Sequence, residues 1–187
     1  PGISTIPRHF RENGYRTAAV GKIFHHPDDG KEAWSDLTTR HDYPNSLGQQ
    51  ELWRDYQAPE NVATKQSKLP LGAAGPAWEA ANVPDSIYYD GKTTNMALSK
   101  LDELVKSDKP FFFGVGFIRP HLPFNAPKKY WDLYQREDIE LPNNYLMPKD
   151  APKEAWFNYG ELRSYTNIPN DSLPLSNELT RSLRHGY

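Results

Sequence analysis

Two apolar runs interrupt an otherwise polar chain, and each ends abruptly in a basic segment. From Phe111 to Ile118 every residue is apolar or glycine, a pattern typical of a strand covered on both faces of a parallel sheet. Pro120 and Pro123 end this run, and each proline restricts the residue before it to an extended backbone. The pattern predicts a short, stiff loop at the carboxyl end of a strand, and this loop presents His121.

An earlier part of the chain repeats this arrangement. Ser4–Asn13 predicts a short helix, Tyr15–Val20 predicts a strand, and Lys22 and His25 follow that strand directly. If the two strands are parallel, we expect Lys22, His25 and His121 to meet at one edge of the sheet, where open α/β sheets bind their ligands. A lysine and two imidazoles around one point suit an anion and proton transfer.

A helix is predicted to precede the second apolar run. Asp90 can cap a helix over about Lys92–Lys106. Its predicted apolar face consists of Ala97, Leu98, Leu101, Leu104 and Val105. Helix and strand together make a typical half of a βαβ unit. The fold class we expect is therefore α/β, with a mainly parallel sheet, packed helices and long ordered loops.

The rest of the chain predicts less regular structure. Asn125 can cap a short helix that starts at Pro127, and Ser176 can cap a final helix over Asn177–Tyr187. The stretch Pro27–Asp85 shows little periodicity and reads as a long folded loop. Tryptophans in such loops can stack on sugar rings, but anchoring the loop is the more common role.

Composition limits the classes of function. With 187 residues, the chain is long enough for one domain with its own core. A net charge of −2 argues against nucleic acid or a membrane surface as partner, and no apolar run reaches the length of about 20 residues that a membrane helix needs. The absence of cysteine excludes disulfides, thiolate metal sites and a cysteine nucleophile within this sequence.

Three segments carry a resemblance to a known family. They are STIPRHFRENGYRTAAVGKIFHH near the start, LDELVKSDKPFFFGVGFIRPHLPF in the middle, and APKKYWDLYQREDIELP after it. The combination of G-K-x-F-H with R/K-P-H-x-P-F is fairly specific, whereas either motif alone would be weak. On these segments the chain resembles the sulfatase family, and most closely its iduronate-2-sulfatase-like branch.

The resemblance implies a reaction and roles for three residues. Sulfatases hydrolyse sulfate esters with a formylglycine nucleophile beside a Ca²⁺ ion. By motif, Lys22 would bind sulfate, His25 would act as the base that ejects it, and His121 would bind sulfate or protonate the leaving oxygen. Apart from the resemblance, the guanidinium of Arg119 can pair with a substrate carboxylate or sulfate. The implied fold is alkaline-phosphatase-like, and the implied substrate is a sulfated sugar or glycosaminoglycan.

Parts of the family pattern are missing from this sequence. It contains no C/S-x-P-S-R motif, no early Asp-Asp pair of the family type and no late Asp-His-Gly, and Asp28-Asp29 stands in the wrong place for a metal site. We therefore expect residues 1–187 to be an internal fragment of a single catalytic domain, inactive alone and without tightly bound Ca²⁺. Unpaired strand edges predict self-association, and the family implies an exported parent protein: periplasmic, extracellular or lysosomal.

Simpler interpretations stay open for each residue. Lys22 can be a solvated lysine, His25 and its neighbour His26 can be loop histidines bonded to the backbone, and Arg119 can form a structural salt bridge. At the level of function, the alternatives are a non-catalytic domain that binds an anion or carbohydrate, and a phosphoesterase of the same superfamily.

Overall fold

The chain forms two compact units that alternate along the sequence. The computed structural model describes residues 3–24, 30–36, 55–67, 75–144, 148–155, 160–171 and 174–187. The first unit consists of Pro1–Trp53 and Asp85–Arg119, and the second of Arg54–Pro84 and Pro120–Tyr187. A single domain over residues 1–187 stays a prediction.

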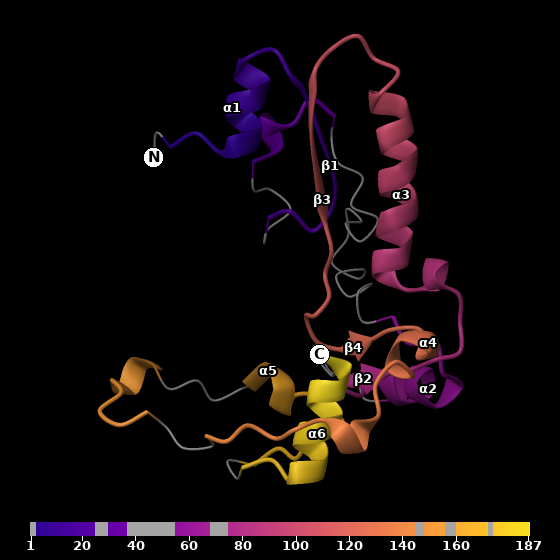
Figure 1. Ribbon diagram of the computed structural model, residues 1–187, viewed down its shortest axis with the longest axis vertical. Helices are drawn as coiled ribbons and strands as arrows, with labels where there is room; N and C mark the ends of the chain where they lie inside the picture. The colour runs from indigo at the N-terminus through magenta and orange to yellow at the C-terminus, as the bar shows by residue number, and fades with distance from the viewer. Residues whose placement is uncertain are drawn as a thin grey trace. The chain divides into compact units, whose positions relative to one another are not determined.

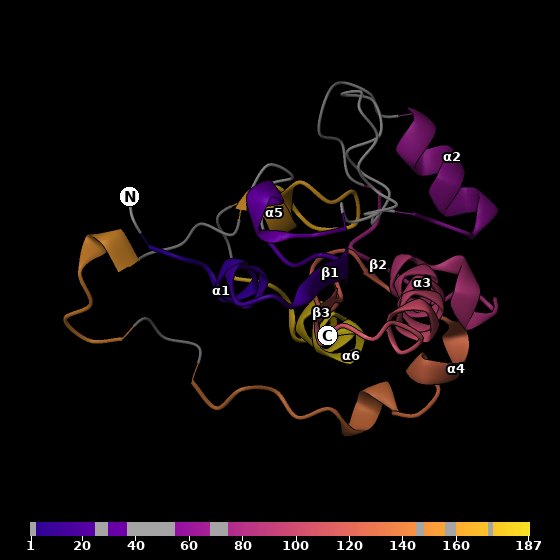
Figure 2. The ribbon, with the colours of Figure 1, turned by 90° about the horizontal axis from the view of Figure 1, so that it is seen from above.

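Two parallel strands form the centre of the first unit. Strand β1 (Arg16–Gly21) pairs with β3 (Phe111–Gly116) in parallel, with Arg16 opposite Phe111 and Gly21 opposite Gly116. The pairing confirms both predicted strands and their parallel direction. Figures 1 and 2 show the pair lying between helix α1 (Ile6–Glu12) and helix α3 (Tyr89–Leu104). Parallel strands flanked by helices agree with the expected α/β class.

The two strands differ in burial. In β1 every residue after Arg16 is buried, whereas β3 is half-buried and Val115 is 39% exposed. The expectation that the second apolar run is covered on both faces was therefore wrong. One face is well covered, because Phe10 of α1 stacks on Phe112 at 4.7 Å between ring centroids and Trp34 packs on the same ring.

Helix α1 follows its sequence signals closely. Pro7 lies in its first turn, where a missing backbone N–H costs nothing. Gly14, just past the end, has a φ of +86° and turns the chain toward β1. Thr5 is the N-cap residue, but its side chain makes no capping hydrogen bond. The predicted helix before the first strand is confirmed.

Helix α3 begins earlier than predicted and turns a different face to the core. Tyr88, not Asp90, occupies its N-cap, and the buried residues are Tyr89, Thr93 and Leu104. Leucines and a valine of the predicted face are exposed: Leu98 by 58%, Leu101 by 38% and Val105 by 60%. The core-facing stripe includes a threonine and a tyrosine, which a count of aliphatic residues does not find.

The second unit is built around a very short parallel pair and a terminal helix. Strand β2 (Trp78–Glu79) pairs with β4 (Phe124–Asn125), and helix α6 (Asn177–Gly186) packs near β4. The Ser176 side chain accepts a hydrogen bond from the Leu179 backbone at 3.2 Å, which confirms its predicted cap. A core cluster joins these elements: Ala77, Trp78, Leu122, Leu162, Tyr165, Ile168, Leu175, Leu179 and Leu183.

Two helices in this unit correct the sequence analysis. Asn125 does not cap α4 (Lys128–Trp131): it lies in β4, and its side chain donates to the Asp55 carbonyl oxygen at 3.0 Å. Helix α2 (Pro59–Ser67) was not predicted at all. The buried carboxylate of Glu79 accepts the backbone N–H groups of residues 57 and 58, so the first turn of α2 is organised from twenty residues away.

The remaining elements are short. Helix α5 spans Gly160–Arg163. Single 3₁₀ turns are η1 (Lys31–Ala33), η3 (Asp85–Ile87), η4 (Arg136–Asp138) and η5 (Lys153–Ala155). In the part of the chain that the structure describes, no helix is long and apolar enough to cross a membrane.

Candidate functional site

Lys22 leaves the carboxyl end of β1 at a close approach of two backbones. Its N–H donates to the Gly116 carbonyl oxygen at 2.8 Å. The preceding residue, Gly21, has a φ of +76°, and a Cβ there would collide with the Gly116 carbonyl. Among the described residues, the ammonium group of Lys22 has no hydrogen-bond or ion-pair partner. The sequence thus delivers a half-buried cation to the edge of the sheet, with its backbone tightly fixed.

Asp90 fixes the backbone where the chain leaves β3. Its two carboxylate oxygens accept the N–H groups of Ile118 at 2.8 Å and of Arg119 at 3.0 Å. A carboxylate that holds two adjacent amides makes two charge-assisted hydrogen bonds, which are roughly twice as strong as neutral ones. This role was missed because an acidic residue at the start of a helix predicts a cap, and the amides it binds lie 28 and 29 residues further along the chain.

The parallel pairing brings part of the predicted site together. Lys22 and Arg119 both follow the carboxyl ends of neighbouring strands within the first unit. His25 lies outside the described residues, and His121, separated from Arg119 by Pro120 alone, belongs to the second unit. The meeting of Lys22, His25 and His121 at one anion therefore stays a prediction.

The ring of His121 has two defined neighbours in the second unit. Nδ1 lies 2.7 Å from the carbonyl oxygen of Leu122. Nε2 lies 3.8 Å from Oε1 of Glu161 in α5, and both side chains are partly exposed, at 36% and 43%. The imidazole is thus oriented by a backbone carbonyl on one side and faces a carboxylate on the other. Glu161 has no sequence motif of its own and was not predicted.

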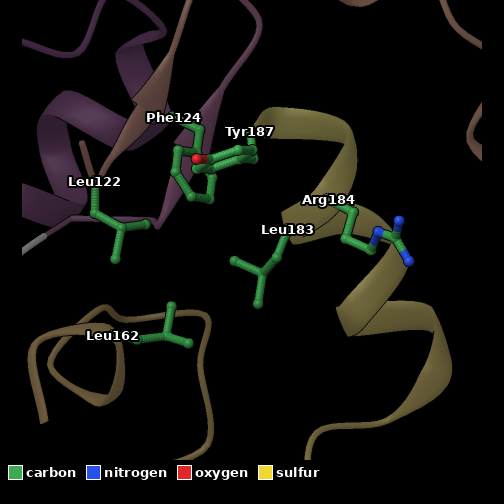
Figure 3. Close-up of a pocket in the computed structure, with 6 residues that line it drawn as sticks. All are labelled: Leu122, Phe124, Leu162, Leu183, Arg184 and Tyr187. Atoms are coloured by element: carbon green, nitrogen blue, oxygen red, sulfur yellow. The ribbon is translucent and has the colours of Figure 1, made fainter. Parts of the chain in front are cut away.

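An apolar pocket lies beside this pair. Its volume is about 430 Å³, and its lining consists of Leu122, Phe124, Leu162, Leu183, Arg184 and Tyr187. In Figure 3 the leucine side chains extend toward a shared space, whereas the Arg184 guanidinium points away from them. Leu122 and Leu162 directly follow His121 and Glu161, so the pocket wall and the imidazole–carboxylate pair are built on the same two turns.

A second set of charged groups lies at the opposite end of β1. Arg16 binds Asp36 at 2.6 Å and also Glu103, while Lys100 binds Glu103 at 2.7 Å. Hydrogen bonds from Lys100 and Arg16 lower the pKa of Glu103, and hydrogen bonds with Asp36 and Glu103 raise the pKa of Arg16. These cations are neutralised by neighbours, which indicates a structural role and distinguishes them from Lys22.

The described residues supply no metal site. Within 3–24, 30–36 and the other described ranges, no three histidine, aspartate or glutamate side chains cluster closely enough to hold a metal ion. Asp28 and Asp29 lie outside these ranges. A family-type Ca²⁺ ion therefore finds no ligand set among the residues that the structure describes.

Comparisons with known proteins agree with the motifs. A family model described as Sulfatase matches residues 1–174. Iduronate 2-sulfatase of Mus musculus is 31% identical over 196 residues, which cover 99% of this chain and 34% of that protein. Choline-sulfatase of Rhizobium meliloti is 30% identical over 79% of this chain, and a sulfatase of Formosa agariphila is 29% identical over 75%; the chain covers 29% and 26% of them. The chain spans about a third of the length of the curated relatives it matches.

Proposed function

Because the chain belongs to the sulfatase family, we propose that it forms the anion-binding part of a sulfate ester hydrolase. The proposed substrate is a sulfated sugar or glycosaminoglycan, as in the iduronate-2-sulfatase-like branch. The proposed location of the whole protein is outside the cytoplasm, in a periplasm, lysosome or extracellular space.

The observation that carries this proposal is the parallel, in-register pairing of β1 and β3. It places Lys22 and Arg119 just beyond the carboxyl ends of adjacent strands, the edge at which α/β sheets bind ligands. A sulfuryl group in transfer spreads negative charge over its oxygens, and fixed cations at that edge stabilise such charge without reorganising. The Lys22–Gly116 hydrogen bond and the Asp90 clamp fix the backbone from which both cations extend.

Each proposed residue has a task that its chemistry allows. Lys22 binds a sulfate oxygen, Arg119 pairs with a substrate carboxylate or sulfate, and His25 accepts a proton when sulfate leaves. His121 binds sulfate or gives a proton to the leaving alcohol oxygen. When present, formylglycine supplies the nucleophile and Ca²⁺ offsets sulfate charge; we propose that segments outside this sequence provide both, since it has no C/S-x-P-S-R motif.

The test is sulfate release by the longer protein that carries this chain, with an aryl sulfate, a sulfated disaccharide and an aryl phosphate as substrates. We expect turnover of the sulfate esters, and a loss of about 10²–10³ in kcat for Lys22→Ala or His121→Ala, the range seen when one charge-stabilising donor is removed. The matched controls are Lys106→Ala and His9→Ala, which change exposed residues elsewhere.

Each other outcome selects an alternative. Turnover of the phosphate ester alone would identify a phosphoesterase, and binding of sulfated sugar without turnover would identify a binding domain. Full activity of Lys22→Ala and His121→Ala would show that the proposed site is wrong. We expect residues 1–187 alone to release no sulfate, and turnover above background by this chain would contradict the proposal that its nucleophile lies elsewhere.

A further inference from the structure

The contact of His121 with Leu122 determines which ring nitrogen carries the proton. A backbone carbonyl oxygen can only accept a hydrogen bond, so Nδ1 of His121, 2.7 Å away, must be protonated. In the neutral ring Nε2 then carries a lone pair, and in the charged ring it carries the second proton. Any proton that this ring exchanges with a bound molecule is therefore exchanged at Nε2.

Glu161 is held where it can act on that nitrogen. Its backbone carbonyl oxygen accepts two hydrogen bonds from Ser164, from the N–H at 3.0 Å and from Oγ at 2.6 Å. The next residue, Leu162, packs against the core cluster of the second unit. The carboxylate thus projects from an anchored turn, and its Oε1 lies 3.8 Å from Nε2.

We propose that Glu161 is a positioning residue for His121: the Leu122 carbonyl fixes Nδ1, and the Glu161 carboxylate, 3.8 Å from Nε2 and beyond hydrogen-bond distance, orients the ring so that Nε2 is the nitrogen that contacts a sulfate ester oxygen. The inference rests on the proposed function and deepens it, since it assigns the reacting atom. The carboxylate helps to hold the ring in one orientation, so that Nε2 faces a bound molecule when a proton is exchanged. The same carboxylate repels an anionic substrate. Its removal should therefore lower kcat, because the ring is less well oriented, without weakening substrate binding.

His185 provides an internal comparison in the same unit. Its Nε2 lies 2.8 Å from the Trp131 carbonyl oxygen and must donate, while its Nδ1 lies 3.5 Å from Nε of Arg136, which can only donate. Its neutral ring is therefore protonated on Nε2, the reverse of His121. Two histidines with opposite assignments allow one spectrum to test the first step of the inference.

The first experiment is a long-range ¹H–¹⁵N correlation spectrum of the 187-residue chain with labelled histidines, recorded where the rings are neutral. His121→Gln and His185→Gln assign the signals. We expect the Nδ1-protonated pattern for His121 and the Nε2-protonated pattern for His185. Glu161→Gln should shift the Nε2 resonance of His121 and leave His185 unchanged, while the control Glu154→Gln moves neither. An Nε2-protonated His121, or no shift in Glu161→Gln, would overturn the inference.

The second experiment measures Glu161→Gln in the longer protein. We expect kcat to fall about two- to fivefold, the range for partly exposed ion pairs, while KM stays level or falls because a negative charge is gone from the anion site. A lower KM at unchanged kcat would contradict the inference, because Glu161 would then repel the substrate without positioning His121. If the longer protein releases no sulfate from any substrate, the proposed function is wrong. The ¹H–¹⁵N spectrum then still tests whether Glu161 positions the His121 ring.

Discussion

Single residues fix the carboxyl end of β1, and Gly21 is the most constrained of them. Its φ of +76° disfavours any side chain, and an added Cβ would meet both the Gly116 carbonyl and Cγ2 of Thr93. We expect Gly21→Ala to lower the free energy of unfolding by about 2–4 kcal/mol, since strain from left-handed backbone and overpacking add. Urea unfolding followed by circular dichroism measures it.

Gly14 is the matched control for this substitution. Its φ is +86°, but nothing lies within 4 Å of an added Cβ. Gly14→Ala should therefore cost about 1–2 kcal/mol, the backbone strain alone. Equal losses for the two variants would show that the close contact between β1 and β3 does not constrain Gly21.

Glu103 gives the first unit a predicted response to acid. Hydrogen bonds from Lys100 and Arg16 lower the pKa of Glu103 in the folded chain. A carboxyl with a lowered folded pKa stabilises the fold above its unfolded pKa, and this contribution disappears as the pH falls through the folded pKa. We expect Glu103→Gln to reduce Tm near neutral pH by a small amount, because the pair is solvent-exposed.

The decisive measurement is the difference in Tm between Glu103→Gln and the unaltered chain as the solution is acidified. The difference should shrink below the ordinary pKa of a glutamate, since Lys100 and Arg16 stay charged while the native carboxylate is lost. Asp108→Asn changes an exposed carboxylate and serves as the control. A difference in Tm that stays constant with pH would contradict the assigned role.

At the scale of elements, the joint between α3 and β3 depends on one side chain. Asp90 in the first turn of α3 accepts the backbone N–H groups of Ile118 and Arg119. Asn offers one acceptor oxygen and turns an NH₂ group toward an amide donor. We expect Asp90→Asn to cost about 1.5–3 kcal/mol in unfolding free energy, the range for hydrogen bonds to charged groups.

Hydrogen exchange at the amides of Ile118 and Arg119 tests the clamp directly. Both amides should lose protection in Asp90→Asn, while the amides of β3 keep theirs. Asp102→Asn changes an exposed residue of the same helix and should leave both amides protected. Unchanged protection in Asp90→Asn would mean that the loop after β3 is fixed by other contacts.

The sequence predicted those helices and strands whose signals lie within a few residues of the element itself. The strands β1 and β3 and the helices α1 and α6 follow from runs, caps and glycines within a few residues. Helix α2 was missed because Glu79, which binds the two amides just before the helix, lies about twenty residues downstream. The buried stripe of α3 was missed because Thr93 and Tyr89 lie in the core although neither is aliphatic.

The candidate site divides in the same way. Lys22 was predicted from its place after a strand and Arg119 from the chemistry of its guanidinium group, and the parallel pairing places both after the carboxyl ends of neighbouring strands. The partners Asp90 and Glu161 could not be predicted, because each acts on a segment about thirty or forty residues away and carries no motif. Sequence patterns thus identify the residues that follow a strand more readily than the distant partners that orient those residues.

For the molecule as a whole, we propose that copies of this chain self-associate through the outer face of α3. Leu98, Leu101 and Val105 recur at helical spacing and are exposed, and Phe117, just after β3, is 53% exposed. Exposed apolar side chains in such numbers favour association. Light scattering of the 187-residue chain should show a mass that rises with concentration.

A variant with Leu98→Gln, Leu101→Gln and Val105→Gln should reduce that rise. The exposed side chains contribute little to the core, so its circular dichroism spectrum should be unchanged. Substitution of Ser99, Asp102 and Lys106 by Gln alters the same helix without removing apolar surface and serves as the control. A monomer at all concentrations in the unaltered chain would contradict the proposal.

The distance along the chain between β1 and β3 has a consequence for biosynthesis. Arg16 and its partner Phe111 are 95 residues apart in the sequence, and a ribosome adds about 5–20 residues per second. About 5–20 s therefore pass between the synthesis of β1 and that of its partner strand β3. Ala18 and Ala19 at the centre of β1 expose little apolar surface during that delay. We therefore expect the small side chains that pack tightly in the folded protein also to limit aggregation of the nascent chain.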